Sequence, residues 1–129
     1  MEAIKVDRNF CHFRENTRMD KQIINLLLLM ATEINRMETN LLRMDATIRG
    51  FTQLQRGIKR MKTYLASYGF ELVEMVGKPY NMGIVADADF VTDNSLKQGE
   101  QVIRTVNRPQ VNFKGVMIQK ADIVVAQNL

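Results

Sequence analysis

The sequence has 129 residues, of which 46% are hydrophobic and 25% are charged, with a net charge of +4; this composition is typical of a globular domain and excludes a disordered or fibrous chain. The single cysteine excludes an internal disulfide, and Cys11 with the lone His12 cannot supply the roughly four ligands of a structural zinc site. The longest apolar run, Leu26 to Ala31, is much shorter than the roughly 20 residues of a membrane helix, so we expect a cytoplasmic protein with no membrane partner.

An apolar stripe marks the first predicted element. Its residues are spaced alternately by four and three: Ile23, Leu27, Met30, Ile34, Met37, Leu41, Met44 and Ile48. This heptad spacing predicts a long helix whose narrow apolar seam requires another helix along it. Thr17 and Asp20 fit a capping box, so the helix is predicted to start near residue 18 and to run to about residue 48.

A second, shorter helix is predicted from Thr52 to Gly69. The apolar spacing slips after Phe51 and resumes at Leu54, and Gly50 lies at the slip, which indicates a turn around residues 46–52. The resulting helical hairpin has unequal arms and leaves part of the longer seam uncovered.

We expect two copies of this hairpin to pair as a four-helix bundle, because apolar burial favours covering the seam. The predicted dimer interface consists of Ile23, Leu27, Met30, Ile34, Met37, Leu41 and Met44. The alternative is a monomer whose stripe packs on its own β part.

Positive charge is concentrated in the first half of the chain. Residues 1–68 carry +5 (12 basic, 7 acidic), whereas residues 69–129 carry −1 (6 basic, 7 acidic). The densest stretch contains no acidic residue and consists of Arg49, Arg56, Lys59, Arg60 and Lys62. It could attract nucleic acid, an anionic lipid face or an acidic protein. A solvated helix face explains it better, because only Phe51 and Tyr64 lie nearby to stack on bases, and we expect no nucleic-acid binding at physiological salt.

The residues after Gly69 predict strands. Short segments rich in Val, Ile and Phe are separated by turn signals, and they cover residues 70–76, 83–91, 101–106 and 116–125. One of these turns is predicted at Asn107-Arg108-Pro109. No helix of convincing length separates the segments, so we expect a small antiparallel sheet domain and no parallel βαβ unit. The sequence therefore predicts an α+β fold with an N-terminal tail (1–17), a helical dimerisation region (18–69) and a β domain (70–129).

The sequence contains no clear motif for catalysis. Its glycines form neither of the common phosphate-binding loops, and adjacent Cys11 and His12 make a poor nucleophile pair because nothing orients them together. Asp87, Asp89 and Asp93 could hold a metal or act as paired acids, but they do not match a calcium loop, and a solvent-facing sheet edge explains them better. We therefore expect no enzyme activity, no cofactor and no metal.

Three segments carry a family resemblance. Residues 57–73 read GIKRMKTYLASYGFELV, residues 77–81 read GKPYN, and residues 114–125 read KGVMIQKADIVV. In order and spacing they resemble the GrpE family, the dimeric nucleotide exchange factors of DnaK-type heat-shock chaperones. The first segment is similar to the family's second bundle helix running into its first strand, the second to its Gly-x-Pro-[aromatic or Leu]-Asp turn, and the third to its last hairpin. The resemblance runs from about residue 19 to the end.

The resemblance implies a homodimeric cochaperone in protein folding and the stress response, which promotes ADP release by binding the ATPase domain of a DnaK-type chaperone. An exchange factor of this kind needs no catalytic group, because it acts by binding the open form of the ATPase domain more tightly than the closed form. The partner-binding positions that the resemblance implies lie in the β domain: Val106, Arg108, Pro79 and Tyr80.

The sequence departs from the family at several positions. Val85-Ala86-Asp87 replaces a His-[Glu/Gln]-Ala sequence, Pro109-Gln110 replaces Gly-Tyr, and Val116 and Gln119 stand where many members carry arginine. Little sequence precedes Thr17, so we expect most of the N-terminal stalk helix of typical members to be absent here, either because a divergent member has lost it or because the sequence is a trimmed piece.

Other classes of function fit the same sequence. A dimeric adaptor with a GrpE-like fold that has lost exchange activity is indicated by the substituted β-domain positions. A nucleic-acid-binding dimer that uses the basic stretch is a further alternative, and an enzyme is the most distant one.

Overall fold

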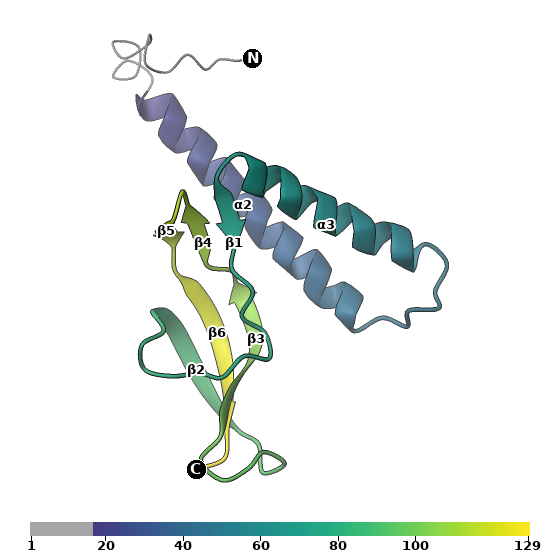
Figure 1. Cartoon of the computed structure of the whole chain (residues 1–129), viewed down its shortest axis with the longest axis vertical. Helices are drawn as coiled ribbons and strands as arrows, with labels where there is room; N and C mark the ends of the chain where they lie inside the picture. The colour runs from purple at the N-terminus through teal and green to yellow at the C-terminus, as the bar shows by residue number, and fades with distance from the viewer. Residues whose placement is uncertain (1–16) are drawn as a thin grey trace. The chain divides into compact units, whose positions relative to one another are not determined.

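The computed structural model describes residues 17–129 and has an α+β fold (Figure 1). Two helices, α2 (Thr17–Leu42) and α3 (Phe51–Ser67), precede six strands: β1 (Phe70–Leu72), β2 (Ala86–Thr92), β3 (Gln101–Arg108), β4 (Val111–Phe113), β5 (Val116–Gln119) and β6 (Ala121–Gln127). The chain divides between Met30 and Ala31 into two compact units, the second of which contains the rest of α2, α3 and these strands. Cys11, His12 and the rest of the predicted tail up to residue 16 lie outside the described residues.

Helix α2 ends at Leu42, so the predicted helix end near residue 48 is wrong. The carboxylate of Asp45 accepts hydrogen bonds from the backbone N–H of Thr47 at 2.9 Å and from the Thr47 hydroxyl at 2.8 Å. Such a local turn competes with the helical hydrogen bonds and stops the helix, although the apolar spacing continues through Met44 and Ile48. These two residues are therefore exposed in the connection between α2 and α3.

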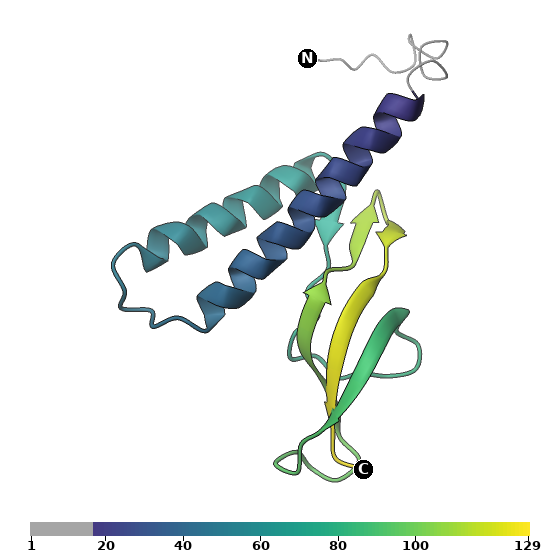
Figure 2. The same ribbon diagram turned by 180° about the vertical axis from the view of Figure 1, so that it is seen from behind.

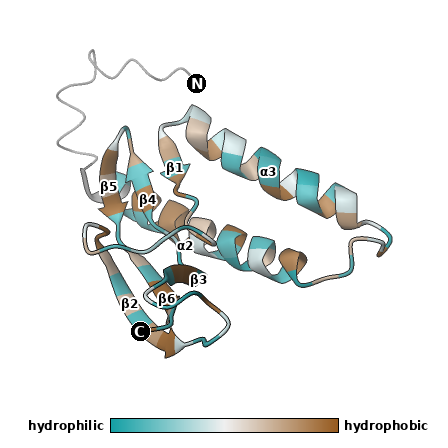
Figure 3. Cartoon of the chain, turned by 60° about the horizontal axis from the view of Figure 1, so that its bottom comes forward, coloured by the Kyte–Doolittle hydropathy of each residue, from teal (hydrophilic) through white to brown (hydrophobic). Residues whose placement is uncertain are grey.

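Helix α3 packs against the C-terminal half of α2. Its preceding residue Gly50 has a φ of 88°, and its buried residue Ile58 forms a cluster with Ile34 and Leu41 of α2. Leu72 of β1 packs against the same cluster. In Figure 3, hydrophobic and hydrophilic segments alternate along α3, as expected for a helix with one buried face.

One long antiparallel ribbon underlies both sheets. Strands β3 and β4 form one arm and β5 and β6 the other, and a turn at Lys114 and Gly115 joins them (Figure 1). Register shifts leave Arg104 and Asn107 as extra residues in β3, which bend the ribbon as β-bulges do. Strand β1 extends the β4–β5 end, giving the order β1-β4-β5, and β2 extends the β6–β3 end, giving the order β2-β6-β3. Figure 2 shows β6 between β2 and β3.

The prediction of a purely antiparallel β domain is wrong, because β2 pairs with β6 in parallel. Strand β2 runs along β6 from Ala86 opposite Ala121 to Thr92 opposite Gln127. Parallel partners need a long connection, and here β3, β4 and β5 supply it in place of a helix. The sheet core consists of Met75, Ile103, Val106, Ala121, Ile123 and Val125, against which Ala86 and Ala88 of β2 pack.

Gly69 joins the helical part to the sheets. It has a φ of 93°, which side chains of L-residues rarely adopt, and its carbonyl accepts a hydrogen bond from the Lys114 backbone N–H at 2.8 Å. A Cβ atom at Gly69 would lie 3.1 Å from Cγ of Lys114 and 3.2 Å from Cε1 of Phe113. The ring of Phe113 in turn stacks on Phe70, with a centroid distance of 4.6 Å. The chain reversal from α3 into β1 therefore requires glycine for both conformation and space.

We expect Gly69→Ala to lower the free energy of unfolding by about 2 kcal/mol or more, because backbone strain of about 1–2 kcal/mol is added to the clash with Phe113 and Lys114. Gly77→Ala is the matched control, since Gly77 has a φ of 84° but nothing lies within 4 Å of its added Cβ. Urea unfolding of both variants measures the difference. An equal loss for the two variants would show that the close packing at Gly69 contributes nothing.

Candidate functional site

A charged cluster lies where the ribbon bends. Arg108 ends β3, and its guanidinium lies 3.5 Å from one carboxylate oxygen of Asp87 in β2. The Lys120 ammonium lies 3.0 Å from the other oxygen of Asp87. One acidic group is thus shared by two basic groups, and all three side chains are about half-exposed. The cluster has a net positive charge that faces solvent.

Arg108 also supports the bend itself. Its Nε donates a hydrogen bond to the carbonyl of Lys120 at 3.3 Å, while the Gln119 amide donates to the carbonyl of Pro109 at 2.8 Å. Pro109 is buried and Arg108 belongs to β3, so the predicted protruding turn at Asn107-Arg108-Pro109 is wrong. The ribbon continues past this point because the Arg108 and Gln119 side chains donate hydrogen bonds to the Lys120 and Pro109 carbonyls, where the backbone ladder is interrupted.

Pro79 and Tyr80 lie on the segment that covers the free edge of β3. Pro79 is exposed and bridges to Val102, and the Tyr80 backbone N–H donates to the Gln101 carbonyl at 3.0 Å. The Tyr80 ring meets the ring of Phe90 edge-on, with a centroid distance of 5.5 Å. Pro79 also lines a largely apolar cleft of about 540 Å³, so it lies on a hollow surface, whereas Tyr80 packs against the core.

Val106 is only 6% exposed and belongs to the sheet core. Its backbone carbonyl accepts a hydrogen bond from the side-chain amide of Asn35 in α2 at 2.8 Å. Val106 is therefore a core residue whose backbone is held to α2 by Asn35. Of the four residues that the resemblance implies for partner binding, Pro79 is exposed, Arg108 and Tyr80 are partly exposed, and Val106 is buried.

The predicted dimer seam separates into two groups. Ile34 and Leu41 are buried within the chain, at 4% and 6% exposure. Ile23, Met30 and Met37 are each exposed by more than 40%, Leu27 is half-buried, and Met44 is exposed beyond the end of α2. Sequence periodicity could not separate the groups, because the whole stripe has one spacing.

Three further exposed apolar residues lie outside the predicted dimer interface, although the apolar run that contains Leu26 and Leu29 is predicted to be covered by self-association. Leu26 and Leu29 of α2 are 54% and 59% exposed, and Leu54 of α3 is 57% exposed. The continuous apolar run around Leu26 was the available signal. Leu26 and Met30 of the first unit and Met37 of the second are thus exposed apolar residues of α2, and we call them the apolar flank.

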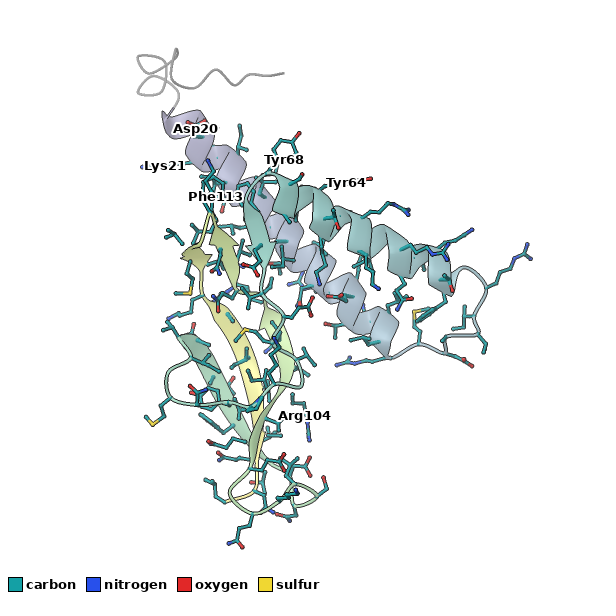
Figure 4. The ribbon with its side chains drawn as sticks, in the orientation of Figure 1. Asp20, Lys21, Tyr64, Tyr68, Arg104 and Phe113 are labelled. Atoms are coloured by element: carbon teal, nitrogen blue, oxygen red, sulfur yellow. The ribbon has the colours of Figure 1, made fainter. Side chains whose placement is uncertain are left out.

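The basic stretch is divided as well. The Lys62 ammonium lies 3.1 Å from Glu38 of α2 and also bonds to Glu74, so it is an internal tie rather than part of a solvated face. Burial favours its neutral form, but the hydrogen bonds to Glu74 and Glu38 outweigh burial and raise the pKa of Lys62 above its ordinary 10.5. Arg49, Arg56, Lys59 and Arg60 are exposed. Tyr64 on α3 and Tyr68, the residue that caps its C-terminus, are exposed by 60% and 77% and are labelled in Figure 4.

The three aspartates of the β domain do not converge. Asp87 belongs to the bend cluster, whereas Asp93 bonds to the Ser95 hydroxyl at 2.6 Å and to Arg104, which projects from β3 in Figure 4. The bonds from Ser95 and Arg104 lower the pKa of Asp93 to about 2. Within residues 17–129, no three His, Cys, Asp or Glu side chains are placed to hold a metal ion.

Comparison with known proteins gives no assignment: no protein-family model matches the sequence, and no curated protein matches it. In the part of the chain that the structure describes, no helix is long and apolar enough to cross a lipid bilayer.

We expect Lys62→Met to lower the free energy of unfolding at neutral pH by about 1 kcal/mol, because Glu38 and Glu74 lose their shared partner. A raised pKa in the folded state means that the stabilisation is complete below the unfolded pKa and is lost as pH rises through the folded value. The difference between wild type and variant should therefore shrink above about pH 10.5. Lys59→Met, an exposed site on the same helix, is the control; an equal effect there would contradict the internal tie.

Proposed function

We propose that this protein is a homodimeric nucleotide exchange factor of the GrpE type, which promotes ADP release from a DnaK-type chaperone. The observation that supports the proposal most is the local structure of the three resembling segments. Residues 57–73 run from α3 through the left-handed Gly69 into β1, as a bundle helix entering a first strand would.

The other two segments fit in the same way. In residues 77–81, Gly77 has a φ of 84° and the Asn81 side chain accepts a hydrogen bond from the Gly83 N–H at 2.8 Å, so Asn81 can replace the family's aspartate as the turn acceptor. Residues 114–125 contain the turn at Lys114 and Gly115, followed by β5 and most of β6. These matches concern element type and order, and they are the basis of the proposal.

The mechanism requires differential binding and no chemistry on this chain. A partner that binds the open ATPase domain about 10⁴-fold more tightly than the closed one shifts the population from about 1% open to about 99% open, and ADP then dissociates. The surface we assign to this contact comprises Pro79 at its cleft and Arg108 with Lys120 at the bend. Their excess positive charge suits an acidic rim on the chaperone and would mainly raise the association rate.

The homodimer in this proposal is a four-helix bundle formed by α2 and α3 of two copies. The apolar flank supports it: Leu26, Met30 and Met37 follow at spacings of four and seven, so they lie on one side of α2 and remain exposed in the single chain. Exposed apolar side chains that recur on one side of a helix are typical of an association site.

We expect Leu26→Glu combined with Met30→Glu to convert the dimer into a folded monomer, since both side chains are about half-exposed in the single chain but would be desolvated between two copies. Light scattering measures the mass and circular dichroism the helix content. Asn25→Glu introduces the same kind of charge at an exposed polar site of α2 and should leave the dimer intact. A monomeric wild type at micromolar concentration would contradict the proposed bundle.

We expect Arg108→Glu to slow exchange by about tenfold, because it replaces attraction to an acidic rim with repulsion. Stopped-flow release of fluorescent ADP from a DnaK-type chaperone measures the rate. The substitution also removes the hydrogen bond to Lys120, at a cost to stability of about 1 kcal/mol, so a structural control is necessary.

The unfolding midpoint of Arg108→Glu measures the effect of losing that hydrogen bond, and Asp87→Asn controls for the loss of the ion pair with Asp87. It breaks the same ion pair but leaves Arg108 in place, and it should preserve or increase the exchange rate. If both variants slow exchange equally, the bend needs the ion pair and Arg108 contacts no partner. A wild-type dimer that accelerates release from no chaperone of its own cell would favour the adaptor alternative.

A further inference from the structure

A polar groove lies between the C-terminal half of α2 and the end of β3. Its volume is about 390 Å³, and one wall includes Asn35, Thr39 and Asn40, which lie on one side of α2, together with Arg43 just beyond the end of the helix. Asn107, an extra residue of the bulged strand, lies on the opposite wall. β-Bulges commonly redirect a side chain in this way next to binding sites.

The two walls are fixed to each other within this unit. The Asn35 side-chain amide donates to the Val106 carbonyl at 2.8 Å, across 71 positions of sequence. This bond leaves the neighbouring Asn40, Thr39 and Asn107 groups facing a groove of set width. A ligand therefore meets donors that are largely pre-organised, which lowers the entropic cost of binding.

The groove lining contains two arginines and no acidic residue. Of the nearby glutamates of α2, Glu38 pairs with Lys62 outside the groove, whereas Glu33 pairs with Arg36 of the lining. Among the residues that the structure describes, Arg43 has no ion-pair partner. The groove is thus a donor-rich surface with an uncompensated positive charge.

We propose that this groove binds an acidic peptide segment of a partner protein, independently of nucleotide exchange. Arginine offers a planar set of N–H donors to carboxylates, and the amides of Asn40 and Asn107 can both donate to and accept from a peptide backbone. Arg43 and Asn107 are exposed, so a single small anion gains little from them, whereas a chain of carboxylates makes several contacts at once. The lining has no aromatic side chain on which a base could stack, which disfavours nucleic acid.

The test is fluorescence anisotropy of a labelled hexaglutamate peptide with the full-length protein at 150 mM salt. Arg43→Gln and, from the other wall, Asn107→Asp should each weaken binding about fivefold. Arg56→Gln on α3 is the matched control, because it makes the same charge change at an exposed arginine outside the groove lining and should leave binding unchanged.

Several outcomes would overturn the proposal. They are an equal loss in Arg56→Gln, no peptide binding, or displacement of the peptide by inorganic phosphate or by an oligonucleotide at equal concentration of charge. Arg43 also lies just beyond the C-terminus of α2, where a cation stabilises the helix by a few tenths of a kcal/mol. The unfolding midpoint of each variant is therefore measured as well. Loss of the helix-end effect would lower the stability of Arg43→Gln, but it could not weaken peptide binding in Asn107→Asp.

Discussion

The bend of the long ribbon is the constraint on which the β domain depends. Strands β3–β4 and β5–β6 change direction together, and the backbone ladder is interrupted at Pro109 and Lys120. A buried carbonyl left without a partner costs about 1–3 kcal/mol, a cost that applies at the buried Pro109 more than at the exposed Lys120. The Gln119 and Arg108 side chains supply the missing donors, so one continuous ribbon can take part in two sheets. Both added strands then follow: β1 joins one end of the ribbon and β2 the other.

The same constraint explains why structural and candidate binding residues coincide. Arg108 uses its Nε on the bend, and its terminal nitrogen reaches Asp87, so the guanidinium is held at the surface in a fixed direction. Asn107, one residue earlier, is displaced by the bulge and lies in the polar groove. The bend therefore places Arg108 in the charged cluster and Asn107 in the polar groove, so the end of β3 contributes to both candidate binding surfaces.

Local sequence signals predicted much of this fold, and non-local pairing accounts for most of what they missed. The two-helix start, the switch to strands at Gly69 and the α+β class follow from periodicity and glycine positions. The end of α2 was missed because Met44 and Ile48 continue the apolar spacing beyond the turn made by Asp45. The parallel pairing of β2 with β6 depends on Ala86 and Ala88 packing on the core, which no local pattern encodes.

The stripe on α2 shows how one sequence pattern can serve two kinds of burial. Ile34 and Leu41 lie at heptad positions and pack on Ile58 in the same chain, so they contribute to folding whether or not a second copy is present. Met30 and Met37 have the same spacing but remain exposed, so their apolar surface contributes about 25 cal/mol per Å² only when a partner covers it. Substitutions at Ile34 therefore test folding, whereas substitutions at Met30 test whether a second copy associates. Only the structure of the single chain separates these roles, because both groups satisfy the same heptad rule.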